Sequence, residues 1–210
     1  MKIALINGSP KAKRSSSGVL LSDLKGYFGE NAVVEELFFR TQTLPEGTIE
    51  KLANADAWVI ACPLYVDGVP GHLLSCLVQL EEAHLQKPET RIYGIVNCGF
   101  YEGIQAEFAL DILKNWSAKA GFVWGGGLGL GGTGGLASQP KKVFGFNIKA
   151  PIEKALKALA NTILAKGVQE NSYCSLAVPR FVYKACVHLS WRRNIRKNGG
   201  KTKDLGRIPE

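Results

Sequence analysis

Residues 1–18 read MKIALINGSPKAKRSSSG, and this stretch decides the fold class. The apolar run at residues 3–6 ends at NGSP (residues 7–10), a combination that is typical of a chain turn. Basic residues and three consecutive serines follow, and an amphipathic pattern begins at Val19. We therefore predict a buried strand, then a hydroxyl-rich loop, then a helix.

This loop has the properties of a phosphate-binding site. The N–H groups at the start of a helix are unpaired and carry partial positive charge, so a phosphate binds there readily. Gly, Ser and Pro also serve simply to turn a chain and cap a helix, and this plainer interpretation stays open. The loop contains neither G-x-x-x-x-G-K-[ST] nor G-x-G-x-x-G, which argues against a nucleotide triphosphatase loop and a dinucleotide-binding Rossmann turn.

Length and composition indicate a globular protein. The chain has 210 residues, of which 46% are hydrophobic, enough for one full core plus an appendage. No uninterrupted apolar run approaches the roughly 20 residues that a membrane span needs. The apolar run near the beginning is shorter than the h-region of a secretory signal. We therefore expect a cytoplasmic protein.

The chain has five cysteines, an odd number, and they are widely spaced. No C-x-x-C pair occurs, so the sequence supports neither a zinc site nor an iron–sulfur cluster. The three histidines also lack acidic or cysteine partners at metal-ligand spacing, and no metal site is expected. We expect reduced and mostly buried thiols at Cys62, Cys76, Cys98, Cys174 and Cys186.

Positive charge is concentrated toward residue 210. Of the net charge of +8, residues 178–210 carry +7, from nine Lys or Arg and two acids. We predict a main domain of residues 1–170 and a basic helical extension of residues 171–210. The extension either docks on the domain or on a dimer mate, or its cationic end with Trp191 makes weak contact with a membrane surface. No nucleic-acid-binding module is visible, and no nucleic-acid partner is expected.

Apolar segments alternate with helical patterns along the main domain. We predict strands at residues 2–6, 32–39, 57–62, 91–97 and 122–124. Helical periodicity occurs between them and after them, at residues 70–80, 104–116 and 152–163. This alternation predicts an α/β fold in which helices cover both faces of a parallel sheet.

Ligands of such folds bind at the carboxyl ends of the strands, so the loops after the strands form the candidate site. The first loop offers phosphate-binding groups, and the loops at residues 63–71 and 97–103 offer aromatic side chains and backbone amides. The glycine tract at residues 125–135 either lets a flat group approach its backbone or acts as a flexible linker. Together these loops suit a planar, phosphorylated cofactor.

Three motifs carry a resemblance to a known family: NGSPK at 7–11, PLYVDGVPG at 63–71 and NCGFYEG at 97–103. They resemble the flavodoxin-like NAD(P)H-dependent FMN reductases, over about residues 1–165. The resemblance implies a three-layer α/β/α sandwich with a five-stranded parallel sheet of order 2-1-3-4-5, a bound FMN and a homodimer. The closely spaced cysteines of the iron–sulfur branch of that superfamily are missing here.

The resemblance also implies which residues form the cofactor site. The FMN phosphate would contact Ser9, Lys11, Ser16, Ser17 and Gly18. One side of the isoalloxazine ring would face Pro63, Leu64, Tyr65 and Val66. The other side would face Asn97, Cys98, Gly99, Phe100 and Tyr101. Because the flavin carries the hydride chemistry, no catalytic side chain is expected.

These observations predict an FMN-dependent oxidoreductase. It would take a hydride from NAD(P)H onto flavin N5 and pass electrons to a small acceptor such as a quinone or a nitro compound. A flavodoxin-type electron carrier with protein partners is the alternative. Carriers of that kind tend to be acidic, whereas this chain is near neutral with a basic end, which favours the enzyme. A cofactor-free domain whose C-terminal segment does the work also remains open.

Overall fold

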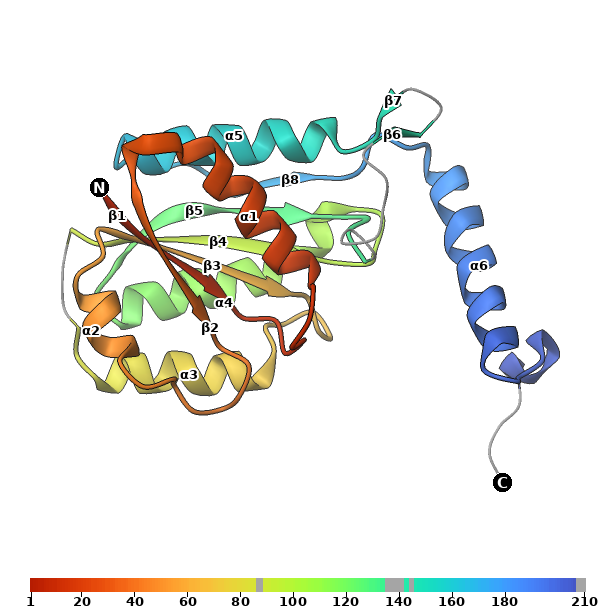
Figure 1. Cartoon of the computed structure of the whole chain (residues 1–210), viewed down its shortest axis with the longest axis horizontal. Coiled ribbons are helices and arrows are strands. Elements are labelled where there is room, and N and C mark those ends of the chain that lie inside the picture. The colour runs from red at the N-terminus through yellow and green to blue at the C-terminus, as the bar shows by residue number, and fades with distance from the viewer. Residues whose placement is uncertain (86–88, 135–141, 144–145, 207–210) are drawn as a thin grey trace. The chain divides into compact units, whose positions relative to one another are not determined.

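The structure is a computed structural model that describes residues 1–85, 89–134, 142–143 and 146–206. The chain forms two compact units, Met1–Ala177 and Val178–Glu210, and each is described by itself. The first unit contains a six-stranded parallel sheet in the order β2-β1-β3-β4-β5-β8 (Figure 1). Its strands are β1 (Lys2–Asn7), β2 (Val33–Phe38), β3 (Ala57–Pro63), β4 (Arg91–Asn97), β5 (Val123–Leu130) and β8 (Ser172–Cys174).

Helices cover both faces of this sheet (Figure 1). On one face lie α1 (Ser16–Phe28) and α5 (Ala150–Leu164), and on the other lie α3 (Gly71–Glu82) and α4 (Glu107–Lys119). The predicted three-layer sandwich and the strand order 2-1-3-4-5 are therefore confirmed. The other elements of this unit are η1 (Gly29–Asn31), α2 (Thr48–Ala53), η2 (Gly103–Ala106), β6 (Lys142–Val143) and β7 (Phe146–Asn147).

The sheet has one strand more than the five predicted. The additional strand, β8, pairs with β5 and has only three residues, Ser172, Tyr173 and Cys174. A segment this short shows neither an apolar run nor a clear alternation, so periodicity could not reveal it. The sheet therefore continues into residues 171–210, the segment for which only a helical extension was predicted.

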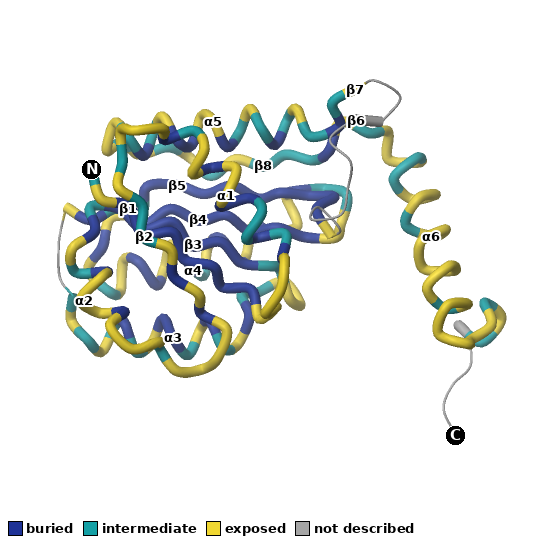
Figure 2. The backbone as a smooth tube through the Cα atoms, in the orientation of Figure 1, coloured by how far each residue is buried: buried dark blue, intermediate teal, exposed yellow. Residues whose placement is uncertain are grey.

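The central strands are apolar because both of their faces are covered. Figure 2 shows β1, β3 and β4 buried between helices whose outer faces are exposed. Six of the seven residues of β3 are buried, and Trp58 among them packs on Phe122 with ring centroids 4.7 Å apart. The indole nitrogen of Trp58 donates a hydrogen bond of 3.2 Å to the carbonyl of Leu52, so its one polar group is satisfied. Such packing fixes the strand ends that carry the candidate site.

The glycine tract does not form the loop that was predicted. Most of it belongs to β5, which continues to Leu130, while Gly135 lies outside the described residues. A Cβ on Gly125 would collide with the ring of Tyr93, and one on Gly131 would lie 2.6 Å from the backbone nitrogen of Gly103. The predicted close approach thus exists, but the atoms that approach are the protein's own.

Replacing Gly131 with alanine should destabilise the first unit. The new Cβ would press on backbone atoms, and overpacking of this kind costs about 1–3 kcal/mol. The matched control is Gly26→Ala on the exposed side of α1, where a Cβ meets nothing within 4 Å. Because alanine favours a helix, the control should gain about 0.5–1 kcal/mol. Urea unfolding followed by circular dichroism measures both, and equal stability of the two variants would contradict this packing.

The second unit consists of α6 (Arg180–Lys197) and η3 (Thr202–Gly206). No residue of α6 is buried, and its large apolar side chains Phe181, Leu189 and Trp191 are 75%, 66% and 61% exposed. Its Lys and Arg residues are Arg180 and Lys184 near the start and Arg192, Arg193, Arg196 and Lys197 near the end. Among the described residues, no helix combines the length and the apolar character that crossing a membrane requires.

Candidate functional site

The loops after β1, β3 and β4 meet at the carboxyl edge of the sheet and enclose a pocket of about 170 Å³. Ten of the predicted residues lie on its wall, and Ser15 and Gly134 join them. The lining residues are Ser9, Lys11, Ser15, Ser16, Ser17, Pro63, Leu64, Tyr65, Asn97, Cys98, Gly99 and Gly134. The topology therefore brings three distant motifs of the sequence into one cavity, as ligand sites of parallel α/β sheets require.

Four predicted residues lie away from this wall: Gly18, Val66, Phe100 and Tyr101. Gly18 is in the first turn of α1, where its N–H donates to the Ser15 hydroxyl. The carbonyl of Phe100 accepts a hydrogen bond from Gly132, and its side chain is 57% exposed. Through that bond the β4 loop holds the chain that follows β5.

The first loop is shaped by the side chain of Asn7, which is 8% exposed at the end of β1. Its Oδ1 accepts a hydrogen bond of 3.0 Å from the Ser9 N–H, and its Nδ2 donates one of 3.4 Å to the Ser15 hydroxyl. Ser15 in turn is the N-cap of α1. The N–H groups of Ser16 and Ser17 precede the first intrahelical hydrogen bond, from the Val19 N–H to the Ser15 carbonyl, and helix starts of this kind are common anion sites.

Two serines of α1 connect this loop to the other strand ends. The Ser17 hydroxyl donates a hydrogen bond of 2.7 Å to Asn97 Oδ1 at the end of β4. The Ser16 hydroxyl donates one of 2.8 Å to the carbonyl of Thr133, beyond β5. Each hydroxyl oxygen keeps acceptor capacity, and its proton can rotate toward another acceptor. The start of α1 is thereby fixed against three strands.

The loop after β3 forms a tight turn. Tyr65 and Gly68 exchange two backbone hydrogen bonds of 3.0 Å, and Val66 and Asp67 between them have φ of 47° and 59°. A β-branched residue in this left-handed region is strained, and such strain is concentrated at functional sites. The Val66 side chain is fully exposed at the tip of the turn, whereas the Leu64 N–H is anchored to the carbonyl of Asn97.

Cys98 contributes an uncharged wall to the pocket. Burial raises the pKa of its thiol, a backbone hydrogen bond with Phe100 lowers it, and the nearby charge of Glu102 raises it further. Because the pKa lies above the ordinary value of 9.0, the thiol is protonated at neutral pH. A protonated thiol is a poor nucleophile, so the geometry gives Cys98 no covalent role. Among the described residues, no group of three or more His, Cys, Asp or Glu could hold a metal ion.

The exposed Cys186 and the buried Cys98 should react with iodoacetamide at different rates. At pH near 7, the exposed Cys186 should react, whereas Cys98 should stay unmodified because its thiol is both buried and protonated. Modification of Cys98 should increase only at alkaline pH, because burial raises the pKa of its thiol. Peptide mass spectrometry measures both sites in one sample. Equal rates at Cys98 and Cys186 near neutral pH would contradict this assignment.

Comparison with known proteins adds evidence on the fold. Neither a known family profile nor a curated protein matches the sequence. Solved structures do match. An oxidoreductase from Corynebacterium diphtheriae has a TM-score of 0.59 at 13% identity, covering 79% of this chain and 96% of its own. A WrbA-like flavodoxin from Agrobacterium tumefaciens has a TM-score of 0.54 at 14% identity, covering 79% and 96%.

The chain has a flavodoxin-like fold. An NADH:FMN oxidoreductase structure also matches, with a TM-score of 0.57 at 14% identity, over 80% of this chain and 91% of that one. The fold predicted from the three motifs is thus confirmed. In this flavodoxin-like chain, the pocket lies just beyond the carboxyl ends of β1, β3 and β4, where such sheets place their ligands.

Proposed function

We propose that this flavodoxin-like chain is an FMN-dependent oxidoreductase. It would oxidise NAD(P)H by hydride transfer to flavin N5 and reduce a small acceptor such as a quinone or a nitro compound. The observation that carries the proposal is the pocket at the carboxyl edge, whose lining combines the start of α1 and Lys11 with Pro63, Leu64 and Tyr65. Similarity to an NADH:FMN oxidoreductase supports the same conclusion.

The residues at the α1 end of the pocket fit the phosphate of FMN. The N–H groups of Ser16 and Ser17 and the hydroxyl of Ser9 are hydrogen-bonding groups that a dianion requires. Lys11 adds a positive charge on the same wall. Among the described residues that line this pocket there is no carboxylate, so an anion meets no like charge from them. The donor set therefore matches the group.

The opposite end of the pocket fits a flat ring. Pro63, Leu64 and Tyr65 come from the β3 loop and offer a largely apolar wall. Gly99 lines the same pocket, and among the described residues a Cβ there would meet Gly134 at 3.9 Å, an ordinary contact distance. The side-chain-free backbone leaves room for a ring beside the β4 loop.

When bound, the flavin would supply the redox chemistry, and the protein would bind, orient and shield it. The hydrogen bonds of Asn7, Ser15 and Ser17 hold the phosphate-binding loop in place before a ligand arrives, which reduces the entropy cost of positioning. The protonated Cys98 adds no charge beside the ring. No step of this proposal requires a side-chain base.

We also propose that the chain forms a homodimer through α3 and α4. Leu74 and Val78 lie one turn apart on α3 and are 44% and 45% exposed, and Phe108 on α4 is 65% exposed. The two helices are joined by a hydrogen bond of 2.9 Å from Trp116 Nε1 to the carbonyl of Leu77. Exposed apolar side chains on both helices favour association, and a second copy is the partner that the resemblance implies.

Turnover measurements separate the enzyme from the alternative electron carrier. Purified chain supplied with FMN should oxidise NADH or NADPH continuously when a quinone is present, and the absorbance of the reduced nicotinamide should fall. An electron carrier should bind FMN and yet show almost no steady-state consumption. FMN binding without turnover would contradict the proposed enzyme and favour an electron carrier, the alternative that the structural similarity to flavodoxins supports. A chain that binds no FMN would overturn both.

The double variant Ser16→Ala, Ser17→Ala should bind FMN more weakly. The two hydroxyls hold the start of α1 against Thr133 and Asn97, and their protons can rotate toward the phosphate. A hydrogen bond to a charged phosphate contributes about 1.5 kcal/mol or more, so the dissociation constant should rise at least about tenfold. The matched control is Ser75→Ala on α3, whose hydroxyl bonds to the Gly71 carbonyl away from the pocket. Flavin fluorescence titration measures the affinity, with circular dichroism as a check of folding. Unchanged affinity in the double variant would exclude these two hydroxyls as phosphate ligands.

A further inference from the structure

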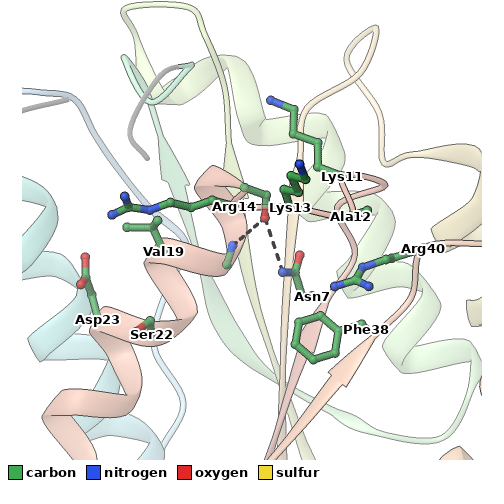
Figure 3. Close-up of a pocket in the computed structure, with 12 residues that line it drawn as sticks. Asn7, Lys11, Ala12, Lys13, Arg14, Val19, Ser22, Asp23, Phe38 and Arg40 are labelled. Carbon is green, nitrogen blue, oxygen red and sulfur yellow. Dashed lines mark hydrogen bonds between the residues drawn. The ribbon is translucent and has the colours of Figure 1, made fainter. Parts of the chain in front are cut away.

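A second pocket of about 440 Å³ lies on the other side of the β1–α1 loop (Figure 3). The two pockets share Lys11 and Ser15, so they are separated only by this loop. The end of β2 and the first turns of α1 form its remaining walls. Its lining residues are Asn7, Lys11, Ala12, Lys13, Arg14, Ser15, Gly18, Val19, Ser22, Asp23, Phe38 and Arg40.

The second pocket is strongly basic. Lys11, Lys13, Arg14 and Arg40 line it, against one acidic residue, Asp23, which Figure 3 shows beside Ser22 on α1. Within the described part of the chain, none of these four cations forms an ion pair with a carboxylate. Holding four cations around one cavity costs repulsion, which a bound anion of at least two charges would relieve.

The floor of this pocket also offers a stacking surface. The Phe38 ring at the end of β2 is 42% exposed, and the guanidinium carbon of Arg40 lies 4.7 Å from its centroid. A guanidinium held over an aromatic ring presents a flat, cationic face on which a nucleobase stacks. Asn7 lies beside them, its amide already held by Ser9 and Ser15. The cations suit a phosphate and the stacking face suits a nucleobase. Together they favour a phosphorylated nucleoside over a simple anion.

We propose that this pocket binds a phosphorylated adenosine, namely the adenosine 2′-phosphate end of NADPH. The inference rests on the proposed function, because the ligand is the reductant of that reaction. Because the two pockets share Lys11 and Ser15, this pocket is next to the proposed flavin site. One extended dinucleotide would place its adenosine end here and its nicotinamide end at the flavin. Lys13 and Arg40 would meet the 2′-phosphate, the group that NADH lacks. The site thereby selects NADPH.

Calorimetric titration of the full chain with adenosine 2′,5′-bisphosphate tests the site without any turnover. The bisphosphate should bind with one-to-one stoichiometry, with or without FMN. In Lys13→Ala, Arg40→Ala its dissociation constant should rise at least about tenfold, because each charged hydrogen bond is worth about 1.5–3 kcal/mol. The control is Lys157→Ala on α5, an exposed lysine that lines neither pocket, and this variant should bind as the unmodified chain does. Inorganic pyrophosphate binding as tightly as the bisphosphate would overturn the stacking of a nucleobase on Arg40 and Phe38.

Steady-state kinetics with the FMN-loaded chain test whether the ligand of this pocket is the reductant NADPH or a free nucleotide. The ratio of kcat/KM for NADPH to that for NADH should fall at least about tenfold in Lys13→Ala, Arg40→Ala, through KM, with flavin content unchanged. An unchanged ratio would overturn the assignment to the reductant and leave a free nucleotide as the ligand. A chain that binds the bisphosphate but no FMN would contradict the proposed function alone. A flavoprotein that does not bind the bisphosphate would overturn this inference alone.

Discussion

The candidate site depends on the buried amide of Asn7, which joins the end of β1 to the start of α1. With only two hydrogen bonds, from the Ser9 N–H and to the Ser15 hydroxyl, it fixes the loop that separates the two pockets. A buried amide without these partners would cost free energy, so the loop conformation and the satisfaction of Asn7 are coupled. The Ser17–Asn97 bond then extends the same constraint to β4.

Much of the fold could be predicted because the central strands are buried on both faces, which leaves continuous apolar runs such as residues 57–62. The parts that were missed obey other constraints. Gly125 and Gly131 lie where side chains and backbone of neighbouring segments come too close for a Cβ, and only the folded structure reveals those neighbours. β8 is held by pairing with β5 and not by its own sequence pattern.

The site was predictable where a loop directly follows a predicted strand, which holds for the residues near Ser9, Leu64 and Asn97. Ser15 could have been found as the hydroxyl that precedes the helix, the ordinary position of an N-cap. The second pocket follows from topology. Because β2 lies beside β1, Arg40 after β2 comes next to the basic residues of the first loop. No single sequence motif includes both Arg40 and the basic residues of the first loop.

The account rests on where a phosphate binds, and a crystal structure of the chain with FMN measures this most directly. We predict the FMN phosphate within hydrogen-bond distance of the Ser16 and Ser17 N–H groups, with the ring between the Tyr65 and Gly99 loops. A phosphate located instead between Lys13 and Arg40, or a flavin found outside both pockets, would contradict the account.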